Sequence, residues 1–178
     1  ATAFSWFSRS HDQFERVEFM RIIVNAISAN TGGIVTYTSN LIEYVSSSDI
    51  ETIVYVPEWF DRSQLGDLDV EVIFVKTKFF GPIHRFLWEQ FVWRRIIKNS
   101  GADVVFSSAN YGVLFPPVPQ VLLVQGEIYL NPVYRERVLP NLSWRERVSA
   151  FLRRNLMLVS ARHSRAVIFP SQAALGSA

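Results

Sequence analysis

The chain has 178 residues, of which 49% are hydrophobic and 19% charged, a composition typical of a folded domain rather than a disordered segment. Its net charge of +2 is too small by itself to indicate a nucleic-acid partner. The chain has no cysteine, which excludes disulfide bonds, thiolate metal ligands and a cysteine nucleophile, and no apolar run approaches the roughly 18 residues of a membrane span.

Short apolar runs then alternate with longer helical patterns along the chain. Residues 1–19 show neither a periodic pattern nor the apolar core of a signal peptide, so we expect an N-terminal extension and, with no cysteine present, a cytoplasmic protein. The predicted strands are 21–27, 52–56, 70–75, 103–107, 120–125 and 166–169. The predicted helices are 33–47, 82–99 and 143–164, the last with Ser143 as its N-cap.

This alternation is typical of βαβ units. The sequence therefore predicts an α/β fold, a Rossmann-like three-layer domain with a mostly parallel sheet, over residues 20–172. Residues 173–178 are expected to begin a linker to a further domain.

The loop Ser28-Ala-Asn-Thr-Gly-Gly33 joins the first predicted strand to the first predicted helix. Gly32 and Gly33 allow a ligand to approach the backbone closely, and the start of the helix offers free N–H groups to an anion. The loop matches neither the G-x-G-x-x-G dinucleotide pattern nor a P-loop. A plain tight turn between strand and helix explains the same residues.

Polar side chains also follow two later strands. Ser108, Asn110 and Tyr111 come after the fourth strand, and Gln125 and Glu127 after the fifth. Open α/β sheets bind ligands at the carboxyl ends of their strands, so we expect Ser108, Asn110, Gln125 and Glu127 to converge with Gly32 and Gly33 on one edge. Neutral amides and hydroxyls suit sugar hydroxyl groups, and tyrosine stacks on a sugar face. Ordinary polar turns and a solvent-facing glutamate remain the alternative.

Several short motifs, taken in order, resemble the N-terminal domain of retaining glycosyltransferases of the group-1, family-four type. They are Met20-Arg-Ile-Ile-Val-Asn25, Thr31-Gly-Gly-Ile-Val-Thr-Tyr37, Gly101-Ala-Asp-Val-Val-Phe106, Val121-Leu-Leu-Val-Gln125 and Ser164-Arg-Ala-Val-Ile-Phe-Pro-Ser-Gln172. The resemblance implies a GT-B enzyme whose two Rossmann-like domains face each other across a cleft. The N-terminal domain would bind the acceptor and the C-terminal domain the nucleotide sugar, with Gly32 and Gly33 close to the donor diphosphate.

The resemblance also implies partners and site residues. We expect a sugar or glycan acceptor, a nucleotide-sugar donor as substrate, no separate cofactor, no metal ion and no nucleic acid. Ser108, Asn110 and Tyr111 are the predicted acceptor-binding residues, and Gln125 and Glu127 the predicted catalytic residues. The donor domain is expected to lie outside these 178 residues, so we expect no transferase activity from them alone.

Gln125 departs from the family pattern, which usually has a histidine at this place. An amide does not act as a general base, although retaining chemistry that relies on the donor phosphate tolerates the change. Two alternatives therefore stay open. The chain is a noncatalytic binding domain that kept the fold, or an unrelated doubly wound domain that binds another phosphate ligand.

The charge is unevenly distributed. Residues 1–134 carry 10 Lys and Arg against 14 Asp and Glu, whereas residues 135–178 carry eight Arg against two Glu. Both long predicted helices mix basic residues with apolar and aromatic ones, namely Phe86, Trp88, Phe91 and Trp93 in the first and Trp144, Val148, Phe151, Leu152 and Val159 in the second. This mixture predicts weak peripheral attachment to an anionic membrane. A helix that packs on a sheet gives the same pattern, and periodicity does not show which way the stripe faces.

Overall fold

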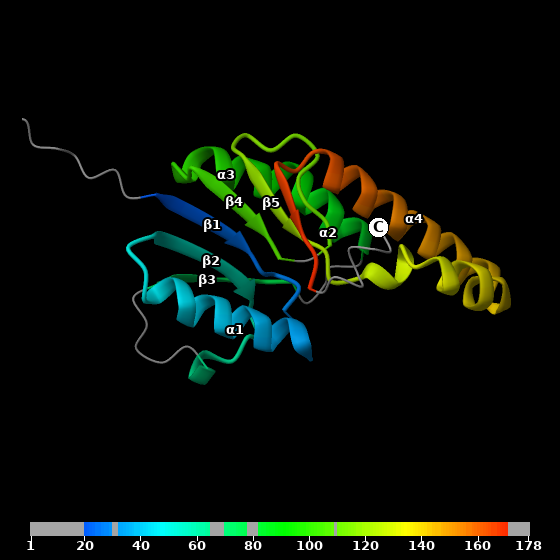
Figure 1. Ribbon diagram of the computed structural model, residues 1–178. Helices are drawn as coiled ribbons and strands as arrows, with labels where there is room; N and C mark the ends of the chain where they lie inside the picture. The colour runs from blue at the N-terminus through cyan, green and yellow to red at the C-terminus, as the bar shows by residue number, and fades with distance from the viewer. Residues whose placement is uncertain (1–19, 30–31, 65–69, 78–81, 109, 171–178) are drawn as a thin grey trace, which may run out of the picture.

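The computed structural model describes residues 20–29, 32–64, 70–77, 82–108 and 110–170 (Figure 1). Six parallel strands form one sheet in the order β3-β2-β1-β4-β5-β6. They are β1 (Arg21–Asn25), β2 (Glu51–Pro57), β3 (Glu71–Val75), β4 (Val104–Ser107), β5 (Gln120–Leu123) and β6 (Ala166–Ile168). This order is that of a Rossmann fold, which confirms the predicted fold class.

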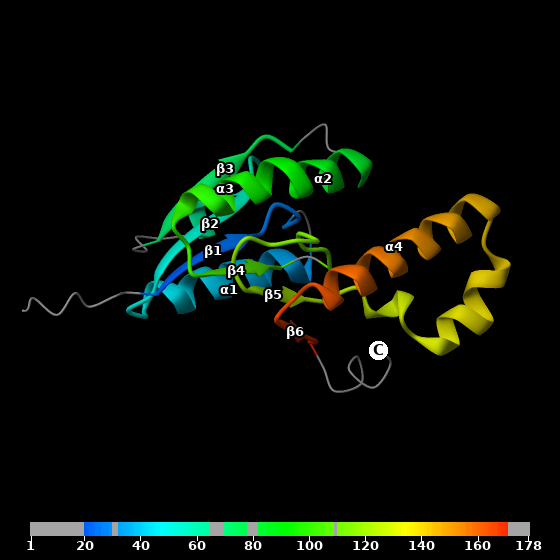
Figure 2. The same cartoon turned by 90° about the horizontal axis from the view of Figure 1, so that it is seen from above.

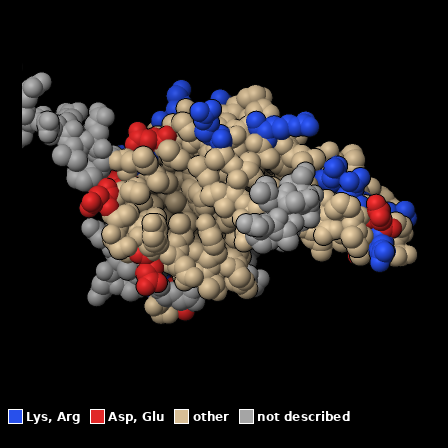
Figure 3. All heavy atoms as spheres, viewed as in Figure 1, with Lys and Arg blue, Asp and Glu red and all other residues tan. Residues whose placement is uncertain are grey.

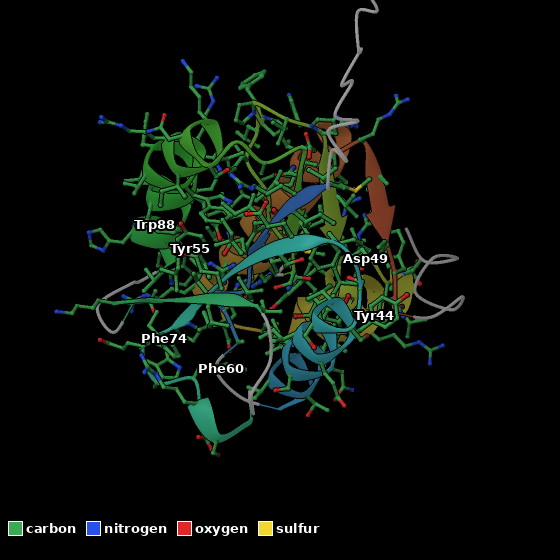
Figure 4. The ribbon with its side chains drawn as sticks, turned by 90° about the vertical axis from the view of Figure 1, so that its left-hand side faces the viewer. Tyr44, Asp49, Tyr55, Phe60, Phe74 and Trp88 are labelled. Carbon is green, nitrogen blue, oxygen red and sulfur yellow. The ribbon has the colours of Figure 1, made fainter. Side chains whose placement is uncertain are left out.

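Helices cover both faces of the sheet, and Figures 1 and 2 show α1 (Gly33–Ser46) on one side and α2 (Pro82–Trp88) with α3 (Arg94–Ser100) on the other. Helix α4 (Trp144–Arg162) lies on the α3 side, because Leu122, which packs with Met157 of α4, shares a face of the sheet with Val105, which belongs to the α3 core. Figure 4 shows Tyr55 and Trp88 on the α2 side and Phe60 and Phe74 on the α1 side.

All predicted strands and long helices are present, and their ends agree with the prediction to within two residues. The prediction of one uniform helix over 82–99 is wrong, because a π-helical turn, η2 (Glu89–Trp93), separates α2 from α3. Glu89 and Trp93, the first and last residues of this turn, are both buried. The 3₁₀ turn η1 (Arg62–Gln64) follows β2. Three further turns between β5 and α4 were not predicted: η3 (Glu127–Tyr129), η4 (Tyr134–Val138) and η5 (Leu139–Asn141).

The predicted N-cap of α4 is confirmed. The Ser143 hydroxyl accepts a hydrogen bond from the Glu146 backbone N–H at 3.4 Å, and the Glu146 carboxylate accepts one from the Ser143 N–H at 2.9 Å. This reciprocal pair satisfies two of the N–H groups that the start of a helix leaves without partners. It also fixes the residue at which α4 begins.

Trp93 is the largest fully buried side chain of the described residues. Its ring meets Tyr55 of β2 edge-on at 4.8 Å between centroids, and it stacks on Trp88 at 6.0 Å. The tryptophans of α2 and η2 therefore contribute to the core, and the prediction that they contact lipid is wrong for Trp93. Phe91, in contrast, is 71% exposed.

The loop between β4 and β5 is held by a polar side chain in the core. Gln120 is fully buried, and its amide accepts a hydrogen bond from the Val113 N–H at 2.9 Å and donates one to the Val113 carbonyl at 3.2 Å. It also donates to the Ser164 hydroxyl at 2.9 Å, which joins β5 to the start of β6. These bonds hold Val113, in the loop that follows β4, against the first residue of β5.

The predicted N-terminal extension (1–19) and linker (173–178), with Ser171 and Gln172, lie outside the described residues. Within the described part of the chain, no helix combines the length and hydropathy needed to cross a bilayer.

Candidate functional site

An open cleft of about 640 Å³ lies at the carboxyl edge of the sheet, where β1, β4 and β5 end side by side. It is lined by Ser28, Gly33, Ile34, Tyr37, Arg85, Asn110, Gln125 and Pro170. Gly33, Asn110 and Gln125 were predicted to meet at this edge, and the structure brings them together. The parallel direction of the strands is the physical reason, because every strand-to-helix loop then leaves the sheet on the same side.

Asn110 joins the loop after β4 to the end of β5. Its side-chain oxygen accepts hydrogen bonds from the backbone N–H groups of Gln125 at 2.7 Å and Gly126 at 2.6 Å. Its own backbone lies at φ 63°, in the left-handed region that asparagine tolerates better than most residues. The oxygen of Asn110 therefore positions Gln125, and the residue shapes the cleft in addition to lining it.

Ser108 lies at the same edge, but its hydroxyl faces inward. Its Oγ donates to the Asn25 carbonyl at 2.8 Å, and its backbone N–H donates to the same oxygen at 3.1 Å. The side chain is fully buried. Ser108 therefore holds β4 against β1, and its predicted contact with an acceptor has no support from this geometry.

The two glycines of the first loop have different roles. Gly32 has a φ of 66°, a conformation that other residues rarely adopt, and it forms the turn that leads into α1. Gly33 is the first residue of α1, and a Cβ added there would meet no described atom within 4 Å outside its chain neighbours and its own helix backbone. Among the described residues no side chain caps the N-terminus of α1, and its first two residues, Gly33 and Ile34, line the cleft.

The remaining predicted residues lie close by. Tyr111 is half-buried against the core beneath α4, and the Arg85 guanidinium lies 5.9 Å from the centroid of its ring. Burial raises the pKa of the Tyr111 hydroxyl. Glu127 begins η3, and its side chain lies outside the described part of the structure.

A buried charged pair beside the cleft was not predicted. Glu89, in the π-helical turn, is 1% exposed, and its Oε1 accepts hydrogen bonds from the Arg85 Nε at 3.0 Å and the Asn25 Nδ2 at 3.4 Å. Its Oε2 has no hydrogen-bond partner among the described residues. Burial raises the pKa of Glu89, and the positive charge of Arg85 partly opposes this. The pair fixes Arg85, a cation, in the wall of the cleft.

The sequence does indicate this pair, through polar residues beside apolar runs, although a search for helical or strand periodicity does not detect it. Glu89 follows the apolar run Phe86-Leu87-Trp88, and Asn25 follows the aliphatic run Ile22-Ile-Val24 in β1. A polar residue at a position expected to be buried needs a partner. Two such residues in one domain therefore indicate a shared contact.

Replacing Glu89 with glutamine is expected to flatten the dependence of stability on pH. Because the folded-state pKa is raised, the native protein keeps this proton to a higher pH than the unfolded chain does. The free energy of unfolding of the wild type should therefore fall as the pH rises above about 4.5, and Glu89→Gln should lack this part of the decline. Urea denaturation at a series of pH values measures both curves. The exposed residue Glu58 provides the control Glu58→Gln, and parallel curves for wild type and Glu89→Gln would contradict the assignment.

The cleft thus combines neutral polar groups with one fixed cation. The Ser28 hydroxyl is buried and has no hydrogen-bond partner in the described part of the chain. Burial raises the pKa of the Tyr37 hydroxyl, so this group remains a donor at neutral pH. The Tyr37 hydroxyl and the amide of Gln125 suit a ligand rich in hydroxyls, while Arg85 and the N-terminus of α1 suit an anionic group on the same ligand or on a second one.

The sequence was also compared with known proteins. The family model of Glycosyltransferase Family 4 matches residues 31–176. This match includes every residue of the cleft except Ser28. No curated protein matches the chain.

Proposed function

The chain belongs to Glycosyltransferase Family 4, and we propose that it forms the acceptor-binding half of a retaining glycosyltransferase. The enzyme would move a sugar from a nucleotide-sugar donor to a glycan or lipid-linked acceptor. The observation that carries the proposal is the cleft at the carboxyl edge, where hydroxyl and amide groups gather beside the N-terminus of α1. In this proposal the donor diphosphate lies near Gly33, and the acceptor lies near Gln125 and Asn110.

The nucleotide of the donor is proposed to bind a second domain that faces this cleft. The N-terminus of α1 and the Arg85 guanidinium would then stabilise charge on the leaving diphosphate, so the proposal includes no metal ion and no cofactor. Gln125 would orient a sugar hydroxyl and Glu127 would supply a carboxylate nearby, while the donor phosphate accepts the acceptor proton. The absence of cysteine supports a cytoplasmic location as part of this proposal.

A transfer assay on the full-length protein tests the proposal. UDP-, GDP- and ADP-sugars are offered with glycan and lipid-linked acceptors, and the anomeric configuration of the product is determined by NMR. Transfer with retention is the expected result, together with no transfer by residues 1–178 alone. A folded full-length protein that neither transfers sugar nor hydrolyses any donor would contradict the proposal.

Gln125 favours a second candidate, a noncatalytic domain that binds glycans without transferring them. Its amide lacks the proton affinity of a general base. The variant Gln125→His separates the two candidates, because a binding domain stays inactive with either residue while an enzyme loses or gains rate. Glycan binding by an inactive full-length protein would support this second candidate.

A further inference from the structure

An apolar stripe on α4 faces away from the sheet. Trp144, Val148, Phe151 and Leu152 follow the spacing i, i+4, i+7 and i+8, so they occupy one sector of the helix about 100° wide. All four are exposed, with Trp144 at 67% and Phe151 at 63%. The buried residues of α4 are Ala150, Met157 and Ser160, which lie on the opposite side.

A helix at the surface of a domain normally packs its apolar side on the core, whereas the apolar stripe of α4 faces away from it. The stripe belongs to an arm, residues 128–162, that contains α4 and the short turns before it. Figures 1 and 2 show this arm projecting beyond the sheet. Contiguous exposed apolar surface of this kind marks an interaction site.

Positive charge surrounds the stripe. Arg145 and Arg147 are exposed and lie on either side of it by helical geometry, and η4 of the same arm exposes Arg135 and Arg137 together with one carboxylate, Glu136. The single carboxylate of α4, on Glu146, is held in the helix cap. Figure 3 shows Lys and Arg side chains on the arm and along the upper edge of the molecule, while most visible Asp and Glu side chains lie at the other end.

We propose that the outer stripe of α4 docks this protein on an anionic phospholipid membrane. An apolar face with tryptophan and phenylalanine, bordered by arginines, is what inserts at the boundary between headgroups and acyl chains. The arginines then meet lipid phosphates, and each contributes about fivefold to binding. A second copy of the chain is a poorer occupant, because pairing two such stripes would bring their arginines together.

The helical segment α2–η2–α3 also contains basic and aromatic residues, but most of its aromatic rings are not exposed. Trp93 is fully buried and Trp88 stacks on it, which leaves Phe91 as the exposed aromatic residue of the α2–η2–α3 segment among those described. Phe91 therefore provides a matched control, since it has similar exposure but lies outside the arm. The docking site is confined to α4 and its neighbouring turns.

The arm begins within a few residues of Gln125, in the wall of the cleft. An arm held on lipid would keep the cleft close to the headgroups, which, if the proposed function holds, suits a lipid-linked acceptor. The docking itself does not depend on catalysis. Transfer to a water-soluble acceptor should be unchanged by substitutions in the stripe, so failure of docking and failure of the proposed function are distinguishable.

Co-sedimentation with vesicles tests the inference. The protein is mixed with vesicles of phosphatidylcholine alone or of phosphatidylcholine with phosphatidylglycerol, at low and at high salt. Binding to the anionic vesicles at low salt and its weakening at high salt are expected. The double variant Trp144→Ser/Phe151→Ser should bind at least about tenfold more weakly, and Arg145→Gln/Arg147→Gln about 25-fold more weakly. The control Phe91→Ser should bind like the wild type.

Far-UV circular dichroism shows whether each variant keeps its helices, and the arginine variant tests the site even if the apolar double variant does not fold. Two results would overturn the inference. One is no binding of the wild type to anionic vesicles at low salt. The other is a loss of binding in Phe91→Ser equal to the loss in the stripe variants. Dimerisation of the wild type through the stripe, measured by sedimentation equilibrium, without binding to vesicles would likewise overturn the inference.

Discussion

Replacing Gly33 with valine is expected to lower the transfer rate of the full-length enzyme about a hundredfold and to leave its stability nearly unchanged. A Cβ at this position meets no described atom within 4 Å outside its chain neighbours and its own helix backbone, and Gly33 does not have a positive φ, so we expect the fold to tolerate a side chain there. The valine would instead occupy the space at the start of α1, where the donor diphosphate is proposed to lie. Steady-state kinetics and urea denaturation measure the two effects.

Gly32 supplies the matched control for this experiment. Its φ of 66° strains any residue with a Cβ, so Gly32→Ala is expected to lower the free energy of unfolding by about 1–2 kcal/mol. Neighbouring glycines thus separate an effect on the ligand from an effect on the fold. A Gly33→Val enzyme that folds normally and keeps the wild-type rate would show that the loop is only a turn.

Replacing Asn110 with alanine is expected to lower the free energy of unfolding by about 2–4 kcal/mol and to reduce activity with it. The substitution removes the oxygen that accepts hydrogen bonds from the N–H groups of Gln125 and Gly126. It also places alanine at a φ of 63°, a left-handed conformation that asparagine tolerates better than alanine does. The loop that carries Gln125 then loses its attachment to the loop after β4. Urea denaturation and a transfer assay are the measurements.

Two further variants of Asn110 separate the contribution of the side-chain hydrogen bonds from that of the strained backbone. Asn110→Asp keeps an oxygen in the same place and should stay within about 1 kcal/mol of the wild type. Asn110→Gly relieves the backbone strain but loses both hydrogen bonds, so it should lie between the other two. Equal stability of all three variants would refute a structural role for the side-chain oxygen.

The sequence predicts the sheet well because its strands are short aliphatic runs bounded by glycine, proline and polar residues. In a parallel sheet the carboxyl ends of such runs also lie beside the cleft. The sequence therefore predicts Gly33, Asn110 and Gln125 as residues of this edge, and all three line the cleft. The direction in which a side chain points depends on packing between distant segments. Ser108 therefore turned out to face Asn25, a residue far away in the sequence.

The same limit applies to Glu89 and to α4. Glu89 lies in the π turn and accepts a hydrogen bond from Asn25 at the end of β1, and neither feature leaves a periodic trace in the sequence. For α4, the sequence predicts the apolar stripe, but the spacing of apolar residues does not determine which side of the helix packs on the sheet. The face that packs is set by Ala150 and Met157, and the more hydrophobic stripe is left outside.

The π turn at Glu89–Trp93 also bears on how this helical segment accommodates changes in length. A π turn holds one residue more than an α turn, and the extra residue is absorbed locally, so the helices before and after it keep their faces toward the sheet. Deleting one residue within this turn would restore an ordinary helix, whereas deleting one in α3 would rotate the residues beyond it by about 100°. The turn is thus the place where this helical segment can lose a residue while α2 and α3 keep their faces toward the sheet.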